Sequence, residues 1–301
     1  MKVAFIGLGR MGWHMARHLS VAGHDVVAHD VDADRASSWQ VEHGGDAASD
    51  PSSAVRGAEL VITSLPADRE LRNVAYGAVG VLDRLTAGSV WVDHTTASAA
   101  VARELADAAA IRGGAFLDAP VSGGVDGAKG GTLAVMAGGP DAAYQQAKPV
   151  VSAYASRITH MGETGTGQLT KMANQICLVG LCQALAEALD FAQAAGLDTT
   201  RLVEVMLKGA SASWQMENRS KQMLEGTYDF GFATELMRKD VRLCLDEARE
   251  LDVPLPITAL VGQFLADVER MGGARWDWCS LMERQRILRT GIARVAGEGP
   301  A

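Results

Sequence analysis

An apolar run at the N-terminus leads directly into three glycines. Gly7, Gly9 and Gly12 follow KVAFI in the spacing G-x-G-x-x-G. The first glycine of such a motif allows a tight turn, the second lets a pyrophosphate approach the backbone, and the third lets a helix pack closely on the strand. The helix N-terminus then offers N–H groups and a favourable dipole to phosphate. We therefore expect a strand–turn–helix that binds a dinucleotide. The expected contact residues of this loop are Gly7, Leu8, Gly9, Arg10, Met11 and Gly12.

An acidic residue ends the second predicted strand. Asp30 follows Gly12 by eighteen residues, where a carboxylate can accept hydrogen bonds from both hydroxyls of an adenosine ribose. That carboxylate would repel a 2′-phosphate. The next residue is Val31, and Arg35 is the nearest cation. These residues predict NAD as the cofactor, with NADP as the alternative. The competing interpretation is a structural turn with an incidental surface Asp.

Short apolar runs alternate with helical patterns through the first half of the chain. Strands alternating with helices at this spacing predict a parallel, doubly wound α/β sheet. We place this domain at residues 1–164. The expected strands are residues 2–9, 24–30, 59–66, 89–96, 115–122 and 132–139.

From residue 165 the pattern becomes helical throughout. Residues 167–196 contain no proline and are rich in Ala and Leu, which predicts one long helix. Gly196 is its expected end, and Asp198 the expected N-cap of the next helix. Further helices are expected at 234–252, 257–273 and 280–295, so residues 165–301 form an all-α domain.

Polar and apolar residues at the ends of two predicted strands are candidates for the ligand crevice. The carboxyl ends of strands in doubly wound sheets face that crevice. Leu65 and Pro66 can wall the adenine or the nicotinamide ribose, and Thr96 offers a hydroxyl. His94 at the same strand end is interpreted as a structural group in preference to a catalytic base.

The densest glycine cluster of the chain lies at residues 118–139. Ser122, Gly123 and Gly124 can present successive backbone N–H groups beside a hydroxyl, an arrangement that binds a carboxylate without any Arg. A glycine-rich loop that only shapes a strand crossover explains the same residues equally well.

Polar residues head the long predicted helix. Lys171 shares a helix face with Asn174 and Gln175, at spacings of three and four residues. Cations are disfavoured in a first helical turn. An amine partly desolvated there has a lowered pKa, which suits a general acid/base. A Lys that extends its amine to solvent is the alternative.

Composition excludes several classes of partner. The net charge is −8 and no block of five basic residues occurs, so neither nucleic acid nor membrane is an expected partner. The four cysteines form no CxxC pair, no metal site is expected, and no signal peptide or membrane-length apolar run is evident. We expect a cytoplasmic protein.

Together these motifs resemble the β-hydroxyacid dehydrogenases, the family that contains 3-hydroxyisobutyrate dehydrogenase. The resemblance rests on GLGRMG, LP at 65–66, DAPVSGGVDGAKGGTL, HMGETGTGQLTKMANQ and LMRKD at 236–240. It implies a Rossmann domain and an all-α domain joined by a long interdomain helix, assembled as a homodimer or homotetramer. It also implies residue roles: Lys171 as the catalytic lysine, Ser122, Gly123 and Gly124 as the substrate-carboxylate loop, Asn174 and Gln175 at the substrate, Thr96 and Lys239 near the nicotinamide, and Phe232 at the entrance.

The chain also departs from the family pattern. Many members have Asn in place of Gln175, and NADP-using reductases of the family have Asn-Arg in place of Asp30 and Val31. The resemblance implies NAD-dependent oxidation of a small 3-hydroxy acid to its semialdehyde. The alternative is an NAD(P)H-dependent reductase of glyoxylate, succinic semialdehyde or tartronate semialdehyde. A non-catalytic nucleotide-binding scaffold is disfavoured because Lys171 is present. Trp214 is interpreted either as a substrate contact or as a core residue of the helical domain.

Overall fold

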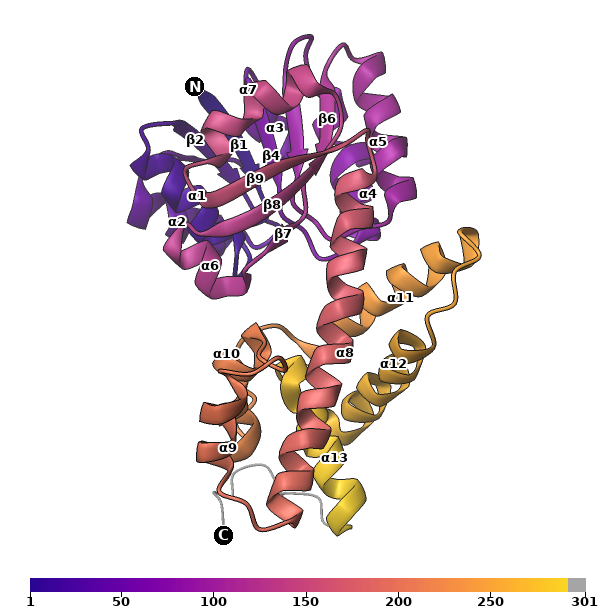
Figure 1. The fold of residues 1–301 in the computed structure, drawn as a ribbon. Coiled ribbons are helices and arrows are strands. Elements are labelled where there is room, and N and C mark those ends of the chain that lie inside the picture. Colours follow the sequence, from indigo (N-terminus) through magenta and orange to yellow (C-terminus); the bar gives the residue numbers. More distant parts are fainter. Residues whose placement is uncertain (292–301) are drawn as a thin grey trace. The chain divides into compact units, whose positions relative to one another are not determined.

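The computed structural model describes residues 1–291 (Figure 1). Contacts divide the chain into two compact units, the first from Met1 to Lys171 and the second beginning at Met172.

A nine-stranded sheet forms the centre of unit 1. The order along the sheet is β3-β2-β1-β4-β5-β6-β8-β7, and β9 pairs with β8. Neighbours from β3 to β6 are parallel, as predicted for a doubly wound sheet. The strands are β1 Lys2–Ile6, β2 Asp25–His29, β3 Asp46–Ala47, β4 Leu60–Thr63, β5 Val90–Asp93, β6 Ala115–Asp118, β7 Val121–Ser122, β8 Leu133–Gly138 and β9 Ala155–Gly162.

One edge of the sheet differs from the all-parallel prediction. β8 runs antiparallel to β6 and β7, whereas β9 is parallel to β8. The chain reverses between β7 and β8, and Gly123 and Gly124, both with positive φ, follow β7 directly at the start of this reversal. The strand β9 was not predicted. Most of its residues beyond Ala155 are exposed or half-buried and several are polar, so it lacks the continuous apolar run of the central strands.

Helices cover both faces of this sheet. Alternate residues of β5 point to opposite faces, so Val90 and Val92 join one buried cluster and Trp91 joins the other. Tyr144 of α7 packs in the first cluster and Leu105 of α5 in the second. The helices of unit 1 are α1 Gly12–Val21, α2 Ala33–His43, α3 Pro51–Val55, α4 Asp68–Tyr76, α5 Ala99–Ile111, α6 Gly124–Gly130 and α7 Asp141–Val151, with the 3-10 turn η1 Val81–Asp83.

The long helix α8, Thr166–Ala194, begins in unit 1 and continues into unit 2 (Figure 1). The described part of unit 2, residues 172–291, is helical apart from the isolated bridge between Ala233 and Asp277. The side chain of Asp198 accepts hydrogen bonds from the N–H groups of Thr200 and Arg201, which confirms the predicted N-cap. The other elements are α9 Thr199–Met206, α10 Trp214–Glu225, α11 Thr234–Glu250, α12 Pro256–Val268, η2 Glu269–Gly273, η3 Trp278–Ser280 and α13 Leu281–Thr290.

The core of unit 2 forms around one face of α8. Val179, Cys182 and Leu189 are fully buried at helical spacing. By length and composition α8 could cross a membrane, with a mean hydropathy of 1.4 over its most apolar stretch, but half of that stretch is buried inside the protein. Trp214 is 51% exposed, so its interpretation as a core residue is wrong. The predicted helix at 280–295 ends at Thr290, and residues 292–295 lie outside the described residues.

Candidate active site

The glycine loop between β1 and α1 has two kinds of glycine. Gly7 has φ +98°, and a Cβ on it would lie 2.3 Å from the carbonyl oxygen of Ser64. A Cβ on Gly12 would lie 1.9 Å from the carbonyl oxygen of Gly7. Contacts with the protein's own backbone therefore require glycine at positions 7 and 12. A Cβ on Gly9 would meet nothing within 4 Å, so the space beside Gly9 is open to a pyrophosphate. The loop thus fits a bound dinucleotide.

Asp30 holds the same loop from the end of β2. It is 8% exposed, and its Oδ2 accepts a hydrogen bond from Leu8 N at 2.7 Å. Its Oδ1 accepts from Asp32 N at 2.9 Å, and Arg35 Nη1 lies 3.5 Å from the same oxygen. Each carboxylate oxygen has two acceptor positions, so Oδ2 keeps one position for a ribose hydroxyl while Asp32 N and Arg35 occupy Oδ1. The hydrogen bond from Leu8 to Asp30 could not be predicted from the sequence, because it forms only where β2 lies beside β1.

A buried polar network joins the carboxyl ends of β4 and β5. Asp93 Oδ1 accepts hydrogen bonds from the hydroxyls of Thr63 and Thr95, both at 2.6 Å. Thr95 Oγ1 in turn accepts from Leu65 N at 3.1 Å. Burial raises the pKa of Asp93 to about 7, against these hydrogen bonds, which lower it. The loops that carry Leu65 and Thr96, two predicted cofactor contacts, are therefore held by one carboxyl group.

His94 has a structural explanation. Its ring is 4% exposed; Nδ1–H donates to the carbonyl oxygen of Ala119 at 2.6 Å, and Nε2 accepts from the Tyr154 hydroxyl at 2.8 Å. Burial lowers the pKa of His94 to about 4, so the ring is neutral near pH 7. Because both ring nitrogens are used inside unit 1, His94 does not fit the role of a catalytic base.

The predicted carboxylate loop connects β7 to α6. Ser122 is half-buried at the end of β7, and Gly123 and Gly124 are exposed. Their φ angles of +122° and +62° favour glycine at both positions. The loop therefore places two exposed glycines next to a half-buried hydroxyl.

Asp118, at the end of β6, fixes the start of α8. Its Oδ1 accepts from Gly165 N at 2.7 Å and its Oδ2 from Gln168 N at 2.8 Å. Burial raises the pKa of Asp118 to about 6, and the backbone hydrogen bonds oppose that rise. These bonds explain why contacts divide the chain after Lys171 while the sequence placed the boundary at 164: the first turns of α8 pack with unit 1.

Lys171 lies on α8 at the end of unit 1 and is 7% exposed. Asn174 and Gln175 follow on the same helix, at the start of unit 2. Gln175 is 2% exposed; its Oε1 accepts from Asn174 Nδ2 at 2.9 Å and its Nε2 donates to Asp240 Oδ2 at 2.5 Å. Lys239 Nζ lies 2.9 Å from Asp240 Oδ1. Both ends of the Gln175 amide are thus engaged within unit 2.

The predicted site residues are divided between the two units. Unit 1 carries the glycine loop, Asp30, Leu65, Pro66, Thr96, the Ser122–Gly124 loop and Lys171, and unit 2 carries Asn174, Gln175, Phe232 and Lys239. The backbone N–H of Phe232 donates to the buried carboxylate of Asp277 at 2.9 Å, which fixes the loop before α11. Residues 1–291 contain no group of three or more His, Cys, Asp or Glu side chains placed to hold a metal ion.

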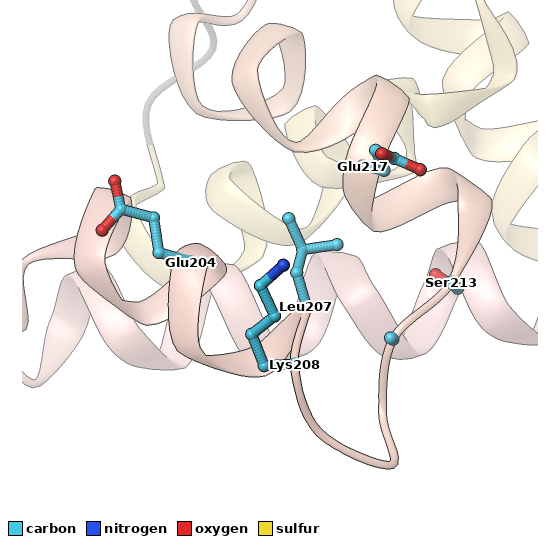
Figure 2. A pocket seen from close by; sticks show the side chains of 6 residues that line it. Glu204, Leu207, Lys208, Ser213 and Glu217 are labelled. Carbon is cyan, nitrogen blue, oxygen red and sulfur yellow. The ribbon is translucent and has the colours of Figure 1, made fainter.

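A hollow of about 450 Å³ lies on α9, α10 and the loop between them, away from the predicted chemistry (Figure 2). None of its lining residues is a predicted site residue. This hollow offers only exposed, solvent-screened charges. The buried networks around the strand ends are therefore the better candidates for the active site, whatever the size of the hollow. Its lining residues are Glu204, Leu207, Lys208, Ala212, Ser213 and Glu217.

Two family models match nearly the whole chain. Residues 2–162 match the NAD binding domain of 6-phosphogluconate dehydrogenase, and residues 165–284 match the NAD-binding domain of NADP-dependent 3-hydroxyisobutyrate dehydrogenase.

Individual proteins are similar over their full lengths. An uncharacterized oxidoreductase of Shewanella frigidimarina is 51% identical, with 94% of this chain and 97% of that protein covered. The 2-(hydroxymethyl)glutarate dehydrogenase of Eubacterium barkeri is 35% identical, with 99% of both covered. The solved structure of Mycobacterium tuberculosis 3-hydroxyisobutyrate dehydrogenase with L-serine has a TM-score of 0.84 at 31% identity, covering 95% of this chain and 99% of that one.

Proposed function

The chain belongs to the β-hydroxyacid dehydrogenase family, and from that premise we propose that it oxidises a small 3-hydroxy acid to its semialdehyde with NAD, using Lys171 as general acid/base. Membership makes it an NAD(P)-dependent hydroxyacid oxidoreductase. The observation that carries the finer proposal is the buried amine of Lys171 on the first turns of a helix fixed to the strand ends by Asp118.

The proposed reaction breaks one C–H bond and one O–H bond of the substrate. The hydride and the proton go to two different acceptors. NAD, which the glycine loop and Asp30 would hold, would supply the acceptor for the hydride of the carbinol carbon. The neutral amine of Lys171 accepts the hydroxyl proton as the C=O bond forms, and the resulting ammonium returns a proton in the reductive direction. The Ser122 hydroxyl and the backbone N–H groups of Gly123 and Gly124 bind the substrate carboxylate. Asn174 orients the substrate.

Gln175 takes a different role from the one the sequence predicts. Its buried amide accepts from Asn174 and donates to Asp240, so we assign it as the residue that orients Asn174 in place of a direct substrate contact. A Gln reaches one methylene further than the Asn of many family members. That extra length supports the bond to Asp240.

We expect the substrate carboxylate to be required. Alcohols that match a good substrate but lack the acid group should have kcat/KM values at least about tenfold lower, since one hydrogen bond to a charged group contributes about 1.5–3 kcal/mol. NAD⁺ reduction measured with 3-hydroxyisobutyrate, 3-hydroxypropionate, serine and 2-(hydroxymethyl)glutarate, each beside its matched alcohol, checks this. Equal efficiency within each pair would remove Ser122–Gly124 from the proposed role.

We expect NAD to be preferred over NADP. The Asp30 carboxylate would repel a 2′-phosphate. Arg35, whose guanidinium lies beside Asp30 and is partly exposed, is the available cation for NADP. Arg35→Ala should therefore leave kcat/KM with NAD within about twofold of wild type. The same substitution should lower kcat/KM with NADP. Paired assays with both cofactors decide: a wild-type ratio in favour of NADP would support the reductase as the function.

We also propose assembly into a homodimer or homotetramer through the helical unit. Unit 2 exposes many large apolar side chains, more than scattered surface residues require. Sedimentation velocity at micromolar concentration measures the assembled mass, and a strictly monomeric chain would contradict the proposal. These side chains are Leu181, Phe191, Leu197, Val205, Trp214, Leu251, Val253, Ile257, Leu260 and Leu288.

A further inference from the structure

We propose that Gln168 is a positioning residue: its side chain ties the loop that carries Thr96 to the turn of α8 that carries Lys171. The inference rests on the proposed function, since it assigns Gln168 to the alignment of Lys171 with the cofactor side of the site. Gln168 lies within HMGETGTGQLTKMANQ, but residue spacing does not reveal its role, because its hydrogen-bond partners lie some seventy residues earlier.

The Gln168 amide makes two hydrogen bonds that bracket Thr96. Its Nε2 donates to the carbonyl oxygen of Thr95 at 2.8 Å, and its Oε1 accepts from Ala97 N at 3.0 Å. The side chain is 1% exposed, so water does not compete for these bonds. The backbone on both sides of Thr96 is therefore held by one side chain.

The backbone of Gln168 is itself fixed. Its N–H donates to Asp118 Oδ2 at 2.8 Å, and a Cβ on the neighbouring Gly167 would lie 2.3 Å from the Asp118 carbonyl oxygen. This turn of α8 thus lies against the end of β6. Lys171 follows at i+3, on the same side of the helix as Gln168. A shift of the Thr96 loop relative to Lys171 therefore requires breaking the bonds of Gln168.

The same network extends to the second cofactor loop. Thr95 Oγ1 donates to Asp93 and accepts from Leu65 N. Through Thr95, the Gln168 amide connects α8 to the loops after β4 and β5. A buried polar network of this kind restricts the arrangement of the elements that it joins, and misplacing a reacting group by about 1 Å can cost about 10² in rate.

The test compares two buried glutamines of one helix. Gln168→Met removes both amide bonds at similar volume. Gln183→Met is the matched control, because Gln183 is 6% exposed on α8 and donates to Glu187, away from every proposed site residue. We expect Gln168→Met to lower kcat at least about tenfold with the NADH dissociation constant within about threefold of wild type, and Gln183→Met to leave both unchanged. In the cofactor-free protein, amide hydrogen exchange of residues 95–98 should be faster in Gln168→Met only.

A second variant keeps the shape of the side chain. The carboxylate in Gln168→Glu accepts from Ala97 N but cannot donate to Thr95 O, whereas its protonated form can do both. Turnover in the reductive direction, divided by that of wild type at each pH, should therefore rise as pH falls. Dividing by the wild-type turnover removes the pH dependence that Asp93, Asp118 and Lys171 give to both proteins.

The outcomes separate this inference from the proposed function. Wild-type turnover in Gln168→Met beside an inactive Lys171→Ala overturns the role of Gln168 alone, and so does unchanged exchange at 95–98. Turnover that survives in Lys171→Ala overturns the proposed function first. Loss of folded protein in both Gln168 variants would also overturn the inference, because Gln168 would then be a core residue with no separate effect on turnover.

Discussion

Lys171→Ala is expected to lose at least about 10² in turnover, as for removal of an acid/base group, while NAD still binds. The substitution removes the amine that accepts the alcohol proton and leaves the glycine loop untouched. Turnover measured in both directions, with NADH binding followed by fluorescence titration, checks this. Near wild-type turnover would exclude Lys171 as the acid/base.

Two further variants separate proton transfer from charge. Lys171→Arg keeps a cation but cannot release a proton near neutral pH, so it should be as inactive as Lys171→Ala. If Lys171 only supplied positive charge, the Arg variant would recover activity. Lys221→Ala is the control, because Lys221 is a largely exposed helical lysine paired with Glu225 and should leave turnover unchanged.

Gly9→Ala is expected to fold normally and to weaken NAD binding at least about tenfold, or about 1.4 kcal/mol. A Cβ on Gly9 meets nothing in the protein but occupies the space through which a pyrophosphate approaches the backbone. Thermal unfolding and the NAD dissociation constant are measured on the same sample. An unchanged dissociation constant would place the pyrophosphate elsewhere.

Gly12→Ala gives the contrasting result. Its Cβ would collide with the carbonyl oxygen of Gly7 inside the protein itself, so we expect loss of folded protein in the absence of any cofactor. Substitution of Gly9 should therefore impair NAD binding, whereas substitution of Gly12 should impair folding. Equal destabilisation by both substitutions would contradict the geometry of the loop.

Local signals in the sequence were sufficient for the parallel sheet, the long helix and the glycine loop. Gly7 and Gly12 are required by contacts within one strand–turn–helix, and Asp198 caps a helix that follows it directly. The strand β9 escaped prediction because edge strands need no continuous apolar run.

Residues that act across the fold were harder to find. Asp118 and Gln168 are far apart in the sequence, and their bonds form only once β6 lies against α8. The family resemblance implies that Gln175 lies at the substrate, and Gln175 shares a helix face with Lys171. Its partner Asp240, sixty-five residues later, could not be identified from helix spacing. Side-chain networks that close between distant elements leave no periodic trace in a sequence.

The buried groups at the strand ends have a consequence for how acidity affects folding. His94, with its pKa lowered to about 4, contributes stability above about pH 6.5 that is lost as pH falls through 4. Asp93 and Asp118, with pKa values raised to about 7 and about 6, contribute stability at low pH that is lost as pH rises through those values. Among these buried groups at the strand ends two oppose one, so together they should stabilise the fold more in mildly acidic than in neutral solution.

Replacing His94 should expose that balance. His94→Gln should steepen the decline in the free energy of unfolding between pH 4 and 6.5 by about 1.4 kcal/mol per pH unit. Chemical denaturation of wild type and variant across this range measures the difference, and parallel curves would contradict it. The neutral imidazole of His94 thus partly cancels the pH dependence of stability that two buried carboxyl groups with raised pKa values produce at the same end of the sheet.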